Sequence, residues 1–412
     1  MALYRTFTTG VRVCCRPLSI SQQHIRHASL NSAIERGFRQ ASRSKKSYYD
    51  HTSSDDRVHD TRGRAQPGGN ADDWAERRSK KKHQYSDEEP ERVKAHVQPP
   101  KAMPHTHPAS EFVYGINAVD AALRCGRRKL YRLYIYQAFG ELLDAHKIAV
   151  RKAALARNVP VKMAFGPWLR LFDQACSGRP HNGCVLEASH LPLLPVKSLY
   201  PLFDPKMDCF GVELAPQSRE EAAVNGSSNE VPIIRGDRGK TFPVVLLLDG
   251  VLDPGNLGAI IRSAYYLGVD AIVFAGRNSA PLSPVAIKSS AGAAENMTFL
   301  HVTNEMDFIK RSQDNGWRFY AAEAPGLGAI VDDGQTQVVN QHPSVLMMGN
   351  EGTGLSNRIR RLADSTVSIP NTRNPVMGFS SDPARVDSLN VSVAAALLME
   401  KFLHVPMEIS QA

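Results

Sequence analysis

Three short segments in the second half of the chain place polar side chains beside glycines or just ahead of a helix. They are Asn256 to Arg262, Gly349 to Gly354 with Glu351 in its middle, and Ser388-Leu389-Asn390. Amide, carboxylate, hydroxyl and guanidinium groups can orient a nucleophile and stabilise developing charge, and glycines let a ligand approach the backbone. Together the segments predict one ligand-binding site with catalytic side chains.

The third segment has the composition of a well-capped helix start. Ser388 and Asn390 are favoured N-cap residues, and the Ala-rich run Val391 to Leu398 follows them. By itself this pattern indicates only a helix whose N-terminus can hold a ligand.

The surroundings of the first two segments are typical of an α/β domain. An apolar strand over 244–248 leads to a helix with Asn256 as its expected N-cap, which ends at Gly268 before a strand over 271–274. Another strand over 345–348 precedes the glycines. Arg262 lies opposite the apolar stripe of its helix, where an isolated arginine is more often a solvated surface residue.

The region upstream predicts a smaller α/β domain over residues 111–190. Strands are expected at 130–136, 159–163 and 184–188, and helices at 118–123, 142–157 and 168–175. Its basic cluster has tyrosines between the cations and consists of Arg127, Arg128, Lys129, Tyr131, Arg132 and Tyr134. This cluster suits RNA backbone contact and base stacking, and it equally suits a solvated turn before a core strand.

The N-terminal part of the chain carries the basic surplus. Residues 1–110 hold 20 of the 50 Lys and Arg and 12 of the 41 Asp and Glu, which leaves 30 against 29 elsewhere. Residues 1–34 contain four arginines and no acidic residue, which is typical of a mitochondrial presequence, with an unstructured N-terminus as the alternative. Residues 35–110 have few aliphatic side chains, so we expect disorder there.

The 412 residues leave room for two folded domains, and no apolar run is long enough to span a membrane. Residues 191–242, rich in proline and turn formers, are expected to form a linker or insertion before a domain over 243–412. The six cysteines contain no C-x-x-C pair, and no His cluster has metal spacing. We therefore expect free thiols and no bound metal.

The motif segments together resemble the TrmH-type branch of the SPOUT RNA methyltransferases. The resemblance is carried by Asn256-Leu257-Gly258-Ala259-Ile260-Ile261-Arg262, by Gly349-Asn350-Glu351-Gly352, and by Ile369-Pro370 with Ser388 to Ala394. Ser289 to Asn296 is also similar to this family. Upstream, Tyr114 to Val119 and His181-Asn182-Gly183 are similar to the ribosomal-protein-like substrate domain of its rRNA enzymes. The resemblance therefore covers residues 111 to the end.

This resemblance implies an α/β fold. The SPOUT domain would have a parallel sheet and a deep trefoil knot, preceded by a substrate-binding domain and a disordered N-terminal arm. It also implies that S-adenosylmethionine binds in the knot against backbone groups of Gly349, Ile369 and Leu389, and that a homodimer assembles the active site. The implied activity is 2′-O-methylation of a guanosine ribose in the peptidyl-transferase region of large-subunit rRNA, in the mitochondrial matrix.

The family resemblance also assigns roles to side chains. A ribose hydroxyl is a poor nucleophile and must be placed in line with the sulfonium methyl group while its proton leaves. Arg262 is the family's proposed base, but because a guanidinium hardly ever loses its proton we favour oxyanion stabilisation and phosphate binding. Asn256 and Glu351 would hold the ribose and Arg262, and Ser388 and Asn390 would complete the pocket.

Two other functions stay open at this point. The chain could be an RNA-binding ribosome assembly factor without turnover, although its motif residues are intact, or a tRNA methyltransferase of the same family, although its separate N-terminal domain disfavours this. One departure from the family pattern is the long segment 371–387, which contains Arg373 and Arg385. These arginines belong either to a surface insertion or to an RNA contact, and Met377-Gly378 are not assigned to the site.

Overall fold

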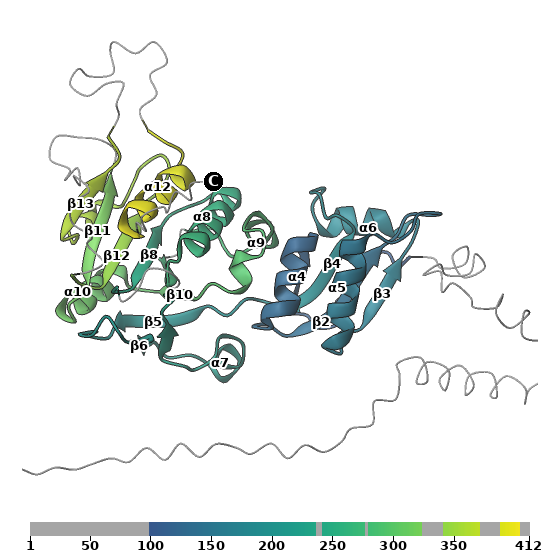
Figure 1. Cartoon of the computed structure of the whole chain (residues 1–412), viewed down its shortest axis with the longest axis horizontal. Helices are drawn as coiled ribbons and strands as arrows, with labels where there is room; N and C mark the ends of the chain where they lie inside the picture. The colour runs from purple at the N-terminus through teal and green to yellow at the C-terminus, as the bar shows by residue number, and fades with distance from the viewer. Residues whose placement is uncertain (1–98, 236–240, 277–278, 324–340, 371–387, 404–412) are drawn as a thin grey trace, which may run out of the picture. The chain divides into compact units, whose positions relative to one another are not determined.

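The computed structural model describes residues 99–235, 241–276, 279–323, 341–370 and 388–403 (Figure 1). The expected presequence, most of the expected disordered segment and the long loop 371–387 lie outside these residues. Within them, none of the helices has both the length and the apolar character needed to cross a membrane. The described elements build two β-sheets, each covered by helices.

The first sheet has four strands in the order β1-β4-β2-β3. Its strands are β1 (Ser110–Tyr114), β2 (Leu130–Tyr136), β3 (Val161–Ala164) and β4 (Cys184–Ser189). Its helices are α4 (Ile116–Cys125), α5 (Ala145–Ala156) and α6 (Trp168–Ala175). β2 and α6 have the predicted bounds. Buried residues of α4 and α5 pack on one face of this sheet and those of α6 on the other.

Order in this region begins ahead of the predicted boundary at Glu111. Met103 is buried, and the fully buried carboxylate of Glu187 on β4 accepts hydrogen bonds from the Thr106 hydroxyl at 2.7 Å and the Ser110 hydroxyl at 2.8 Å. These bonds lower the pKa of Glu187 against the effect of its burial, which raises it. The last residues of the expected disordered segment are therefore part of the folded domain.

The second sheet has nine strands in the order β13-β11-β12-β8-β9-β10-β5-β6-β7. The parallel strands of its motif-bearing half are β8 (Val244–Asp249), β9 (Ala271–Ala275), β10 (Phe299–Val302), β11 (Arg318–Glu323), β12 (Ser344–Met348) and β13 (Ser365–Ser368). Because β12 and β8 are parallel, with Met348 opposite Leu248, their carboxyl ends lie side by side. The turns that follow them therefore meet at one edge of the sheet.

Helices cover both faces of the second sheet. One face is covered by α8 (Pro254–Leu267), α9 (Pro284–Ser289) and α12 (Val391–Leu403), and the other by α10 (Glu305–Asp314) and α11 (Asn357–Arg360). β8 is buried on both sides, since Leu246 packs with the α8 layer and Leu247 with the α10 layer. This explains the uninterrupted apolar run of that strand.

The segment expected to be a linker or insertion contains regular structure. It forms β5 (Leu194–Leu199), β6 (Cys209–Leu214), α7 (Arg219–Asn225) and β7 (Glu230–Pro232). β5 pairs in parallel with β10, and β6 and β7 extend the sheet antiparallel. These short strands were not predicted, because prolines and turn formers separate them. Pairing with neighbouring strands stabilises each of them more than its own residue pattern does.

Candidate active site

The first motif segment opens helix α8, but Asn256 does not cap it. The N-cap is Asp253, whose carboxylate accepts a 2.7 Å hydrogen bond from the backbone amide of Asn256. Pro254 occupies the first turn. Proline there loses no helical hydrogen bond, so Asp-Pro is the stronger start signal. The predicted cap was therefore wrong, and the Asn256 side chain is released for other contacts.

The second motif segment is a tight turn organised by Asn350. Its side chain donates to the Gly250 carbonyl at 2.8 Å and accepts from the backbone amide of Gly352 at 2.8 Å. The backbone groups of Asn350 and Gly354 also form two hydrogen bonds with each other. Asn350 was not among the predicted site residues, although an asparagine between glycines is typical of such side-chain-closed turns.

Gly349 has no room for a side chain in this turn. An added Cβ would collide with the backbone of Gly354 and Leu355, whereas at Gly352 the nearest atom would be 3.5 Å away. We expect Gly349→Ala to lower the free energy of unfolding by about 1–3 kcal/mol and Gly352→Ala to change it little. Urea unfolding of both variants tests this, and equal losses at the two positions would contradict it.

The third motif segment begins helix α12 as its composition predicts. The Asn390 side-chain oxygen accepts from the Ser392 amide at 2.9 Å and from the Ser392 hydroxyl at 2.6 Å. The Asn390 carbonyl starts the helical hydrogen bonds to Val393 and Ala394. Asn390 therefore acts as the cap, and its amide nitrogen points elsewhere.

Side chains from all three segments meet in one hydrogen-bonded chain. Asn390 Nδ2 donates to Asn256 Oδ1 at 3.2 Å, and Asn256 Nδ2 donates to Glu351 Oε1. Asn256 is partly buried, and the other two are exposed. Three residues from distant parts of the sequence thus lie in contact beyond the carboxyl ends of β8 and β12. Open α/β sheets commonly bind ligands at this end of their strands.

The structure does not bring every predicted residue into this cluster. Arg262 is exposed on α8, six residues after Asn256 and therefore about 9 Å further along the helix axis. Ser388 is exposed next to the cluster in sequence. Gly349 and Ile369 directly follow β12 and β13, which flank β11, and Leu389 precedes Asn390 with its side chain 48% exposed.

The basic cluster of the smaller domain has a role that neither sequence interpretation included. The Arg128 side chain is fully buried and pairs with Glu295 at 2.9 Å and with Glu111 at 2.7 Å. Arg127 donates to the carbonyl of Met297. These two arginines join the smaller domain to the segment 293–297 of the larger one, whereas Lys129 stays exposed. The sequence signal for this ion pair was Glu295, because an acidic residue within an apolar run indicates a buried carboxylate that needs a basic partner.

The structure shows an α/β domain with a cluster of polar side chains beyond its parallel strands, and sequence comparison identifies the family. Residues 243–400 match the SpoU rRNA Methylase family. The chain is 34% identical over 313 residues to rRNA methyltransferase 1, mitochondrial, of Saccharomyces cerevisiae, covering 72% of this chain and 70% of that protein. The chain belongs to the SpoU rRNA methylase family.

Other relatives match most of their own length. The protein named rRNA methyltransferase 1, mitochondrial, of Schizosaccharomyces pombe is 32% identical over 327 residues, which cover 76% of this chain and 95% of that protein. The 23S rRNA (guanosine-2′-O-)-methyltransferase of Yersinia pestis is 29% identical over 291 residues, with 70% and 95% covered. The similarity therefore includes the smaller domain as well as the family-matched region.

Proposed function

We propose that the chain is a mitochondrial methyltransferase that transfers a methyl group from S-adenosylmethionine to the ribose 2′-OH of a guanosine in large-subunit rRNA. The target lies in the peptidyl-transferase region. The observation that carries this proposal is the hydrogen-bonded chain Asn390, Asn256 and Glu351, which assembles all three family motifs. The names of the mitochondrial and guanosine-2′-O relatives support the compartment, the RNA and the base.

The residues proposed to hold S-adenosylmethionine fit a nucleoside. Gly349 and Ile369 begin the turns after two parallel strands, and Leu389 precedes the α12 start, so all three can offer backbone groups to an adenosine. The turn at Gly349 is held in shape by Asn350. When bound, S-adenosylmethionine supplies an electrophilic methyl group carried by a sulfonium. We propose that the knot of this family forms here.

The side chains around this place have separate tasks in the proposed reaction. Glu351 and Asn390 fix the orientation of the Asn256 amide, which can then hold the ribose hydroxyl in line for attack. Arg262 stabilises the negative charge that develops on the hydroxyl oxygen and holds the neighbouring phosphate. Ser388 completes the pocket beside Asn390. As the oxygen–carbon bond forms, the carbon–sulfur bond breaks and the hydroxyl proton leaves to solvent.

The proposed domain layout follows from the same function. A presequence over 1–34 directs import, and a basic segment from residue 35 precedes the RNA-binding domain predicted over 111–190, whose folded part already includes Met103, Thr106 and Ser110. Residues 243–412 form the catalytic domain, and 191–242 lie between the two domains in sequence. The strands β5, β6 and β7 of this intermediate segment extend the catalytic sheet.

We further propose that the protein is a homodimer with the active site at the subunit interface. Exposed apolar side chains gather on α8, on α12 and just before them: Leu252, Tyr265, Tyr266, Leu389, Val393 and Leu397. These two helices pack against each other, so their exposed apolar residues lie on neighbouring helices, as an interface with a second copy requires. The distance of Arg262 from the Asn256 cluster also supports a site completed by a second copy.

Tyr266→Arg is expected to weaken this dimer by about tenfold or more, because it places a charge in the apolar surface. Tyr266 is 87% exposed, and Phe203, outside α8 and α12, is 88% exposed. Phe203→Arg is thus a matched control that should leave the association unchanged. Sedimentation equilibrium measures both variants, and a monomeric parent protein would contradict the proposal.

A direct transfer assay tests the proposed function. The purified full chain is incubated with S-adenosylmethionine labelled in its methyl group and with transcripts of mitochondrial large-subunit rRNA or tRNA. We expect labelled 2′-O-methylguanosine in digests of the rRNA alone. Label in tRNA would favour the other substrate, and binding of rRNA without any transfer would make the chain an assembly factor.

A further inference from the structure

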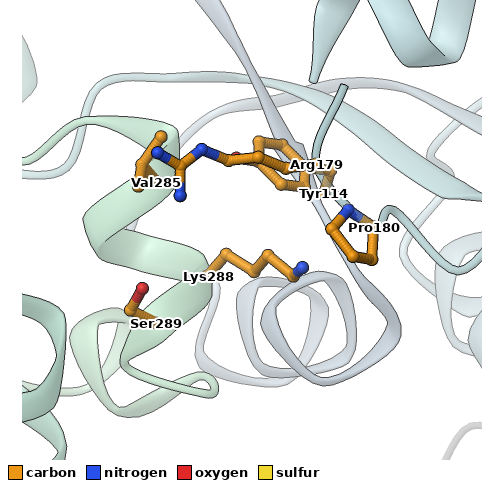
Figure 2. Close-up of a pocket in the computed structure, with 6 residues that line it drawn as sticks. All are labelled: Tyr114, Arg179, Pro180, Val285, Lys288 and Ser289. Atoms are coloured by element: carbon orange, nitrogen blue, oxygen red, sulfur yellow. The ribbon is translucent and has the colours of Figure 1, made fainter. Parts of the chain in front are cut away.

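A small pocket lies where the two sheet domains meet, and no residue of the Asn256 cluster lines it (Figure 2). Its volume is about 240 Å³, and its lining residues are Tyr114, Arg179, Pro180, Val285, Lys288 and Ser289. Tyr114 ends β1, Arg179 and Pro180 follow α6, and the other three belong to α9. Both domains therefore contribute walls to it.

The pocket has a positive lining. Arg179 and Lys288 both line it, with the Arg179 guanidinium on the side of Val285 and the Lys288 ammonium on the side of Pro180, and no carboxylate lines it (Figure 2). In the part of the chain that the structure describes, neither cation forms a salt bridge. Lys288 Nζ lies 5.7 Å from the centre of the Tyr114 ring. Two uncompensated cations facing one hollow favour an anionic ligand.

Tyr114 adds a hydrogen-bond donor that lacks a partner. The residue is 1% exposed, and its hydroxyl oxygen is buried without a hydrogen bond to any described group. Burial raises the pKa of this phenol, so it stays protonated. An unpaired buried hydroxyl is costly, and most such groups in native proteins have a partner that completes them. An anionic oxygen beside Arg179 would serve as that acceptor.

The walls of the pocket are held at fixed positions by the domain junction. Arg128 on the smaller domain pairs with Glu295, just beyond α9. A Cβ added to Gly292 would lie 2.8 Å from Ala121 Cβ, so the two domains are closely packed there. In the other direction α9 packs against α8, because a Cβ at Gly258 would collide with Ser289. The pocket thus adjoins the helix that carries Asn256 and Arg262.

We propose that the pocket formed by Tyr114, Arg179 and Lys288 is a subsite for a backbone phosphate of the RNA substrate. The inference rests on the proposed function, because it takes RNA as the ligand. The volume is below the roughly 300 Å³ at which pockets for drug-sized ligands begin, which suits a phosphodiester better than a whole nucleotide. A phosphate bound here would fix the RNA relative to both domains.

Binding of an rRNA transcript in a salt series tests the subsite. For Arg179→Gln/Lys288→Gln we expect about tenfold weaker binding. The slope of log affinity against log salt should also decrease by about 1 for each phosphate that the protein no longer neutralises. Lys206→Gln/Lys310→Gln, which removes two exposed cations elsewhere, is the charge-matched control and should change the slope less.

Tyr114→Phe separates a ligand role from a structural one. If the hydroxyl binds phosphate, the variant loses a few-fold in rRNA affinity while its thermal stability is unchanged or higher, because the orphaned group is gone. Native affinity and slope in both pocket variants would overturn the subsite, even when the parent protein methylates rRNA. If inorganic phosphate saturates the pocket but rRNA binding is unaffected, a free anion is the ligand and the RNA subsite is wrong. Absence of any rRNA binding or methylation by the parent protein would instead remove the proposed function.

Discussion

Arg262→Ala is expected to lower the rate of methyl transfer by about 10²–10³-fold, the usual effect of removing one donor that stabilises a developing oxyanion. Arg262 is exposed on α8, so its loss should leave the fold intact. Single-turnover kinetics with labelled methyl donor and rRNA measure the chemical step, and urea unfolding confirms stability. A rate within a few-fold of the parent would remove Arg262 from the catalytic machinery.

Two further substitutions define what Arg262 contributes. Arg262→Lys keeps the charge but loses the planar fork, so we expect partial recovery of the rate if charge alone matters and little if two oxygens must be held. Arg124→Ala is the matched control, because Arg124 is an exposed helical arginine paired with Asp120 at 2.9 Å. This control should transfer methyl groups at the parent rate.

Arg128→Met should cause the largest loss of stability, about 3–5 kcal/mol, because it leaves a buried carboxylate without its partner. Glu295 and the Arg128 side chain are both 0% exposed in the pair. Urea unfolding of the full chain measures the loss. Arg124→Met, which breaks an exposed pair, should cost no more than about 1 kcal/mol. Similar losses for the two variants would show that the buried pair does not hold the domain junction.

The Arg128→Met deficit should also depend on pH. Burial raises the pKa of Glu295 above its ordinary value of 4.5, and the charge of Arg128 opposes this. Without Arg128 the pKa moves further up, so the folded state takes up a proton that the unfolded state lacks. The deficit is then largest at neutral pH and shrinks as the pH falls toward 4.5. Arg128→Met/Glu295→Met should recover most of the stability, and a deficit that grows in acid would contradict this account.

The sequence pattern correctly predicted those helices and strands whose bounds are determined by their own residues. β2 and α6 have the predicted bounds, and Gly268 ends α8 in a left-handed conformation. β5 and β6 were missed because their stability comes from pairing with a distant strand. The prediction of Asn256 as N-cap was wrong because Asp253 caps the helix and Pro254 begins its first turn.

The motif residues of the site were predictable, but their connections were not. The sequence places Asn256, Glu351 and Asn390 in separate segments, and only the fold shows that Asn256 bonds to both of the others. In the sequence, Arg128 could be recognised only as part of a basic cluster. Its buried partner Glu295 is 167 residues away, so the ion pair was not predicted. Burial of a charge depends on such distant partners, and no local pattern reveals it.

The most direct test of the central claim maps 2′-O-methylation on mitochondrial large-subunit rRNA in cells. Three strains are compared: one that produces the parent protein, one that produces Arg262→Ala at the same level, and one without the protein. We predict a single guanosine whose methylation is complete in the first and lost in the other two. Normal methylation with Arg262→Ala would refute the catalytic assignment, and normal methylation without the protein would refute the function.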